Sequence, residues 1–127
     1  MVYCPYNLKD VVDASNQNKF NVISTFAGGG GSSTGYRLAG GKVLCINEFV
    51  EEARKTYSEN YPDTPILPDD IKEIGGKELM DAAGVSVGEI DILDGSPPCS
   101  AFSVAGSLAR GGVKTESVNL FGETYIR

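Results

Sequence analysis

Residues 21–31 of the chain read NVISTFAGGGG, an apolar and β-branched run that leads into four glycines. β-Branched residues favour strands and glycine accepts the backbone angles of a tight turn, so residues 21–26 predict a buried strand. Residues 32–38 predict a helix that begins with a Ser or Thr cap and ends at Gly40 and Gly41. A strand, a glycine-rich turn and a helix in this order are typical of the first unit of a doubly wound domain.

Short apolar segments alternate with helical patterns along the rest of the chain. Such alternation indicates β-α-β units and a parallel sheet. We therefore predict an α/β fold with a partial doubly wound parallel sheet, in which residues 1–20 form a lead-in and residues 21–127 form one domain. No helix stop signal precedes Arg127, so we expect the domain to be truncated. The further predicted strands span residues 42–47, 66–67 and 89–94, and the predicted helices span residues 8–12, 49–61, 77–83 and 120–127.

The composition of the 127 residues excludes several classes of function. The chain has no histidine, which rules out Ser-His and Cys-His dyads and Cys/His zinc sites. Its three cysteines, Cys4, Cys45 and Cys99, have spacings that fit neither a disulfide framework nor a four-cysteine metal site, so we expect no metal. The net charge of −6 argues against a surface that holds nucleic acid by charge alone. We expect an intracellular, cytoplasmic protein, because the sequence shows neither a signal peptide nor a membrane span.

The glycine turn and an acid after the second predicted strand form the first candidate site. A dinucleotide fingerprint requires a third glycine where Ser33 stands, and no Gly-Lys pair is followed by Ser or Thr as in a P-loop. Glu48 lies 20 positions after Gly28, where an acid commonly binds both hydroxyls of a ribose. These residues predict a ribose-containing ligand without a pyrophosphate. The alternative is a glycine turn beside a solvated glutamate.

Two further candidate sites follow the third and fourth predicted strands. Asp70 is suited to accept a hydrogen bond from an exocyclic amine and Ile71 to pack on a purine, although such an acid is more often a simple loop residue. Residues 94–100 read DGSPPCS, so Cys99 is expected at the carboxyl edge of the sheet, where ligands bind. Without histidine, a reactive Cys99 must gain thiolate character from amides, a helix terminus or a cation. Cys45, inside a strand, is interpreted as a small buried residue.

Five motifs in this chain resemble, in order, the first five motifs of the DNA (cytosine-5) methyltransferases. They are FAGGGG at residues 26–31, Glu48, the pair at 70–71, PPCSAFS at 97–103, and the segment from Leu120 to Arg127. The resemblance covers residues 21–127. It implies the Rossmann-like fold of S-adenosylmethionine-dependent methyltransferases, truncated after the fourth strand, with the sheet order 3-2-1-4. It also implies methyl transfer from S-adenosyl-L-methionine to C5 of cytosine in double-stranded DNA, as in restriction-modification systems.

The same resemblance assigns roles to single residues. Cys99 is the expected nucleophile, whose thiolate adds to C6 of a flipped cytosine, and Ser100 and Ser103 are expected near DNA phosphates. Glu48 is expected to hold the ribose hydroxyls, and Asp70 to accept a hydrogen bond from the adenine N6. The expected cofactor-binding residues are Phe26, Ala27, Gly28, Gly30, Gly31, Glu48, Phe49, Asp70, Ile71, Pro98 and Leu120.

The chain departs from the family pattern in what it lacks. A Glu-Asn-Val motif, a Gln-x-Arg-x-Arg motif and a target-recognition region are absent from the 127 residues. We therefore expect a fragment that is inactive alone and that self-associates through the open edge of the fourth strand. Three alternatives remain: an S-adenosylmethionine-binding subunit of a split enzyme, an amino-methyltransferase, which Cys99 after two prolines argues against, and a nucleotide-binding module without methyl chemistry.

Overall fold

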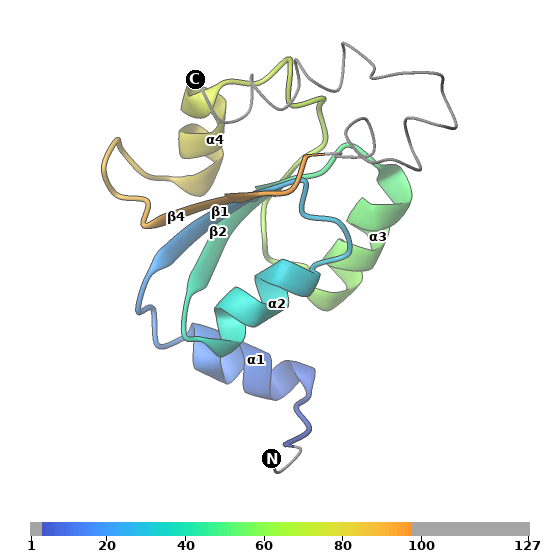
Figure 1. Cartoon of the computed structure of the whole chain (residues 1–127), viewed down its shortest axis with the longest axis vertical. Coiled ribbons are helices and arrows are strands. Elements are labelled where there is room, and N and C mark those ends of the chain that lie inside the picture. Colours follow the sequence, from blue (N-terminus) through green and yellow to red (C-terminus); the bar gives the residue numbers. More distant parts are fainter. Residues whose placement is uncertain (1–3, 98–127) are drawn as a thin grey trace, which may run out of the picture.

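The computed structural model describes residues 4–97, which Figure 1 draws in colour. Within this range the strands are β1 (Asn21–Thr25), β2 (Lys42–Asn47), β3 (Ile66–Leu67) and β4 (Ile92–Gly95). The helices are α1 (Leu8–Ser15), α2 (Gly31–Leu38), α3 (Glu51–Asn60) and α4 (Gly76–Ala83). The predicted helix at residues 120–127 and the predicted site residues Pro98, Cys99, Ser100, Ser103 and Leu120 lie outside the described residues.

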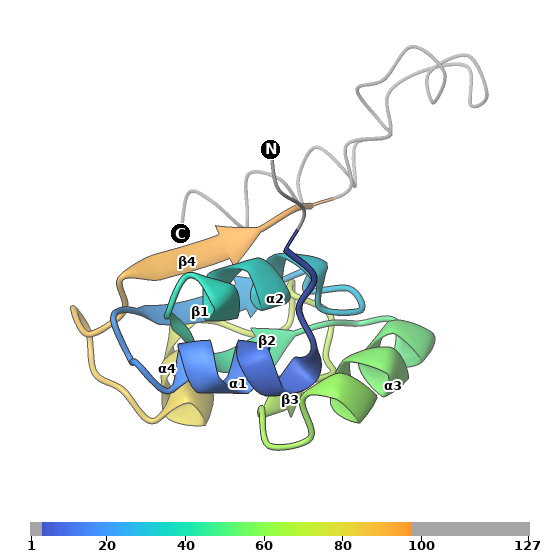
Figure 2. The ribbon, with the colours of Figure 1, turned by 90° about the horizontal axis from the view of Figure 1, so that it is seen from below.

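The four described strands form one parallel sheet with the order β3-β2-β1-β4, which confirms the predicted α/β fold (Figure 2). In the two ladders of β1, Val22 pairs with Val43 of β2 on one side and with Ile92 of β4 on the other. The chain therefore moves outward from β1 to β3 and then returns to the opposite side of β1. In open parallel sheets, ligands bind outside the carboxyl ends of the strands at such a reversal.

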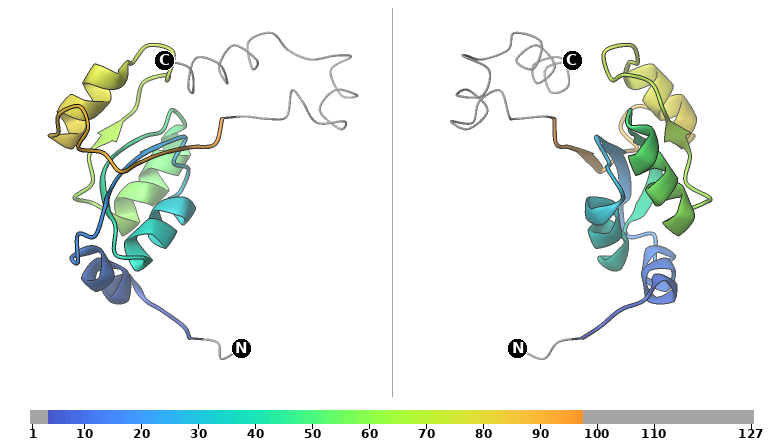
Figure 3. Two further views of the ribbon diagram at one scale, coloured as in Figure 1. Left: turned by 60° about the vertical axis from the view of Figure 1, so that its left-hand side comes forward. Right: turned by 90° about the vertical axis from the view of Figure 1, so that its right-hand side faces the viewer.

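Helices cover both faces of the sheet (Figure 3). On one face, Val22 belongs to a buried cluster with Val11 of α1 and Tyr57 of α3. On the opposite face, Ile23 belongs to a second cluster with Leu79 of α4. Successive residues of a strand point to opposite faces, so the apolar run of β1 contributes to both halves of the core. Among residues 4–97, no helix has the length and hydrophobicity that crossing a membrane requires.

The two helices that flank β1 in the sequence differ from their predicted bounds. α1 reaches Ser15 instead of residue 12, and it begins with a capping box in which Asn7 and Asp10 each accept a hydrogen bond from the other's backbone N–H. The predicted Ser or Thr cap of α2 is wrong, because the N-cap is Gly30, with a φ of 103° and no side-chain hydrogen bond. The glycine turn itself therefore begins this helix.

Other boundaries shift by one to three residues. β1 ends one residue earlier than predicted, because Phe26 has a left-handed φ of 51°. α3 begins at Glu51 instead of residue 49. β4 begins at Ile92 instead of residue 89, because residues 86–89 form a hydrogen-bonded turn. These differences change the lengths of the elements and leave their order as predicted.

β4 forms one edge of the described sheet, where it pairs with β1 alone among the described strands. Leu93 of this strand is 57% exposed. Beside it, between β4 and α4, lies a groove of about 400 Å³ with a mostly apolar lining. Its apolar side chains are Ile23, Leu79, Met80, Val87, Ile90 and Leu93.

Candidate functional site

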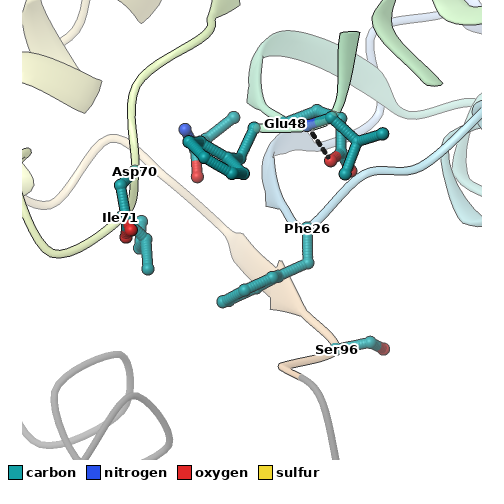
Figure 4. A pocket seen from close by; sticks show the side chains of 8 residues that line it. Phe26, Glu48, Asp70, Ile71 and Ser96 are labelled. Atoms are coloured by element: carbon teal, nitrogen blue, oxygen red, sulfur yellow. Dashed lines mark hydrogen bonds between the residues drawn. The ribbon is translucent and has the colours of Figure 1, made fainter. Parts of the chain in front are cut away.

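A cavity of about 350 Å³ lies beside the carboxyl ends of the strands (Figure 4). This volume lies within the range of roughly 300–1,000 Å³ that is common for small-molecule sites. The cavity is close to the reversal between β1 and β4, the position expected of a ligand site in this type of sheet. It is lined by Phe26, Asn47, Glu48, Phe49, Val50, Asp70, Ile71 and Ser96.

The turn after β1 brings an aromatic ring to this cavity. Phe26 lies in the left-handed region with φ of 51°, which is unusual for a residue with a large side chain. Figure 4 shows its ring projecting from the end of β1 into the cavity. Gly28 and Gly30 continue the turn with φ values of 60° and 103°. A Cβ atom on Gly28 would have no neighbour within 4 Å, so the backbone is open to close approach there.

Glu48 follows β2 and is bonded to the glycine turn. The residue is only 8% exposed, and its Oε2 atom accepts a hydrogen bond from the Gly28 backbone N–H at 2.7 Å. Its Oε1 atom accepts from the Val50 backbone N–H at 2.9 Å, the bond dashed in Figure 4. Two amide donors thus fix the carboxylate, and each oxygen retains a second acceptor position for a ligand hydroxyl. The solvated glutamate considered as the alternative is therefore ruled out.

Asp70 and Ile71 reach the cavity from the loop after β3 (Figure 4). The Oδ1 atom of Asp70 accepts from the Lys72 backbone N–H at 3.0 Å in a local turn. Its Oδ2 atom accepts no hydrogen bond from the residues that the structure describes. Ile71 packs against the second core cluster, which fixes the loop from its apolar side. One carboxylate oxygen is therefore available to a donor in the cavity.

The rim of the cavity is apolar and exposed. Phe49 is 65% exposed and Val50 is 50% exposed, although both are large hydrophobic residues. An aromatic ring held at the mouth of a cavity offers a flat surface on which a planar base can pack. The described lining includes two carboxylates, of Glu48 and Asp70, and neither Lys nor Arg. This charge disfavours phosphate groups and favours a neutral or cationic ligand.

The structure brings five of the predicted cofactor-binding residues together around one cavity: Phe26, Glu48, Phe49, Asp70 and Ile71. Ala27, Gly28, Gly30 and Gly31 form the adjoining turn without lining the cavity, and Ala27 belongs to the first core cluster. The sequence interpretation missed Asn47, Val50 and Ser96, which also line the cavity. Each of the three lies within two residues of Glu48 or of the PPCSAFS motif, and this proximity is the one sequence signal that could have predicted their place at the cavity.

The structure confirms that Cys45 is a small buried residue. It is 0% exposed, and burial raises the pKa of its thiol to about 11. Within residues 4–97, no group of three or more His, Cys, Asp or Glu side chains is arranged to hold a metal ion.

The sequence of this chain is similar to those of known methyltransferases. Residues 20–126 match a family model described as C-5 cytosine-specific DNA methylase. Among curated relatives, the Type II methyltransferases M.AgeI of Thalassovita gelatinovora and M.AquIA of Picosynechococcus sp. are 38% and 39% identical to this chain. The Type II methyltransferase M.NgoPII of Neisseria gonorrhoeae is 33% identical.

The alignments to these three relatives cover 66%, 67% and 87% of this chain but 20%, 34% and 29% of the relatives. The chain therefore spans about a third or less of the length of the curated relatives it matches. The family model, in contrast, matches nearly all of it. The chain belongs to the family of C-5 cytosine-specific DNA methylases.

Proposed function

We propose that this chain is the part of a DNA cytosine-5 methyltransferase that binds S-adenosyl-L-methionine and carries the nucleophile. The whole enzyme transfers a methyl group from this donor to C5 of cytosine in DNA. The observation that carries the proposal is the cavity in which the fixed carboxylate of Glu48 and a free oxygen of Asp70 are both accessible. Membership of the C-5 cytosine-specific DNA methylase family supports the assignment.

The residues around the cavity suit S-adenosylmethionine. Glu48 accepts hydrogen bonds from the ribose hydroxyls at the acceptor positions that its two backbone donors leave free. Asp70 accepts from the adenine N6 amine through Oδ2, and the rings of Phe26 and Phe49 pack against the ligand. A lining with two carboxylates and no described cation favours a positive sulfonium. When bound, the ligand supplies an electrophilic methyl group.

The proposed nucleophile is Cys99, which lies beyond the described residues. β4 ends at Gly95 and lies beside β1, and the carboxyl end of β1 leads to Phe26 at the cavity. This arrangement supports a role at the cavity for the segment that follows β4. The Cys99 thiolate adds to C6 of a flipped cytosine, and the electron pair this places at C5 takes the methyl group. A base then removes the C5 proton, and the thiolate leaves. Ser100 and Ser103 are proposed to contact DNA phosphates.

We propose that methyl transfer requires residues that are absent from the 127 residues of this chain. The Glu-Asn-Val and Gln-x-Arg-x-Arg motifs are absent, and the relatives M.AgeI and M.NgoPII are matched over 20% and 29% of their length. We propose that the chain alone binds the methyl donor and does not methylate DNA. A second candidate is the cofactor-binding subunit of a split enzyme. The described edge of β4, which pairs with β1 alone, favours it because such an edge can receive a strand from another chain.

Calorimetric titration with S-adenosylhomocysteine, the demethylated product, tests the proposed binding. Glu48→Gln replaces one carboxylate oxygen, which now accepts from a backbone N–H, by an NH₂ group that cannot accept. We therefore expect the affinity for S-adenosylhomocysteine to fall about tenfold or more. Glu52→Gln is the matched control, because Glu52 is exposed in the first turn of α3. No binding by the unmodified chain, or equal binding by the two variants, contradicts the proposal.

A further inference from the structure

Asn47 is the last residue of β2 and is bonded to both segments that flank the cavity. It is only 3% exposed, and its backbone carbonyl accepts a hydrogen bond from the Ala27 N–H of the glycine turn at 3.2 Å. Its side-chain Nδ2 donates to the backbone carbonyls of Leu67 at 3.0 Å and of Asp69 at 2.9 Å. One residue thus connects the turn after β1 to the loop after β3.

The loop after β3 is held to the core by the packing of Ile71 and to the sheet by a hydrogen bond from this side chain. β3 has two residues, and its ladder with β2 ends at the pair Asn47 and Leu67. Pro68 follows and has no N–H to donate. Among the described hydrogen bonds, the one from Asn47 to the Asp69 carbonyl alone joins residues 68–71 to another element of the fold. The Asn47 amide therefore extends the attachment beyond the end of the strand, up to the residue before Asp70.

We propose that Asn47 is a positioning residue that holds Asp70 at the cavity that Glu48 also lines, so that one adenosine contacts both carboxylates. This inference rests on the proposed function. An amide is required at this position because both Nδ2 hydrogens face carbonyl oxygens. An aspartate of the same shape would put a carboxylate oxygen against these two oxygens and repel them. Asn47 acts through Asp70, so removing it loosens recognition of the adenine amine.

A double-mutant cycle on S-adenosylhomocysteine binding tests this coupling. We expect Asn47→Ala to weaken binding about tenfold, since two hydrogen bonds that order the loop are lost. In an Asp70→Ala background the same change should weaken binding less than twofold, because Asp70 no longer contributes. Asn60→Ala, at the exposed end of α3, is the matched control and should leave binding unchanged in both backgrounds.

Ligand selectivity is the second readout, because a merely structural role does not alter it. S-Inosylhomocysteine carries an oxygen in place of the adenine amine, so the unmodified chain should prefer S-adenosylhomocysteine at least tenfold. Both Asp70→Ala and Asn47→Ala should lose this preference, and Asn47→Asp should behave like Asn47→Ala. Asn47→Ser is a milder variant that retains one donor and should show an intermediate preference.

The outcomes separate this inference from the proposed function. If the unmodified chain does not bind S-adenosylhomocysteine, the proposed function fails. If it binds but the two substitutions act independently, or the preference survives in Asn47→Ala, the positioning role of Asn47 is overturned alone. If urea unfolding shows that Asn47→Ala and Asn47→Ser both fail to fold, Asn47 is needed for the fold itself and the positioning role is again overturned.

Discussion

Substitutions at Phe26 separate backbone strain from the contribution of the ring. The φ of 51° is unfavourable for any residue with a Cβ, by about 1–2 kcal/mol, and glycine lacks this penalty. Phe26→Ala and Phe26→Gly both remove the ring, so the difference between them reports the backbone alone. After allowing for the larger entropy of glycine in the unfolded chain, we expect Phe26→Gly to be the more stable variant by about 1 kcal/mol.

Urea unfolding measures this difference as a midpoint about 0.3–1 M higher for Phe26→Gly than for Phe26→Ala. The control is Ala53→Gly in α3, where the helical backbone reverses the sign and glycine should lower stability by about 1 kcal/mol. Both Phe26 variants should bind S-adenosylhomocysteine more weakly than the unmodified chain. A Phe26→Gly variant that is no more stable than Phe26→Ala would show that the left-handed backbone is unstrained and refute the reasoning.

Three further predictions rest on separate features. Gly30→Ala should destabilise the fold by about 2 kcal/mol, because the new Cβ would lie 3.2 Å from the Tyr57 ring on a backbone with φ of +103°. Gly31→Ala should not destabilise it, because a Cβ there has no neighbour within 4 Å, and urea unfolding of both variants measures the difference. Burial raises the pKa of Cys45 to about 11 from 9.0, so the unfolded thiol ionises first and the free energy of unfolding should fall as pH rises from 9.0 to about 11. Cys45→Ala should lose that part of the alkaline decline, and an unchanged decline in this variant speaks against the assignment. Finally, β4 pairs with β1 alone among the described strands and Leu93 is exposed, which predicts self-association. Light scattering should detect it at micromolar concentration and Leu93→Lys should reduce it, whereas a monodisperse unmodified chain would argue against it.

The sequence was sufficient to predict the order of the elements and the two strands at residues 42–47 and 66–67, whose bounds the structure reproduces. Both are apolar segments between clear turn residues, so local pattern and tertiary burial favour the same state. The predicted cap of α2 failed because the preceding glycine turn already fixes where the helix begins, with Gly30 as the N-cap, so Ser32 and Ser33 lie inside the first turn. Local propensity suggested a serine cap, but the geometry of the turn determined the result.

The contacts that shape the cavity could not be read from the sequence. Asn47 bonds carbonyls 20 and 22 positions further along the chain, and Glu48 bonds an amide 20 positions before it. Nothing in the local pattern shows that these side chains are buried and bonded, since all three bonds exist only after the three strands have paired. The left-handed Phe26 is equally hidden, because it follows a β-branched run that favours extended backbone.

The end of β2 therefore links the fold to the proposed ligand site. Asn47 and Glu48 bond the glycine turn through Ala27 and Gly28, and Asn47 bonds the loop before Asp70. A ligand that contacts all three segments binds only the folded arrangement, so it must raise the stability of the sheet by mass action. The strained Phe26 fits the same arrangement, because a glycine there would relieve the backbone and remove the ring from the cavity. A Phe26→Gly variant that is more stable than Phe26→Ala but binds S-adenosylhomocysteine more weakly than the unmodified chain would support the proposed role of the ring, because the strain would then accompany a contact with the ligand.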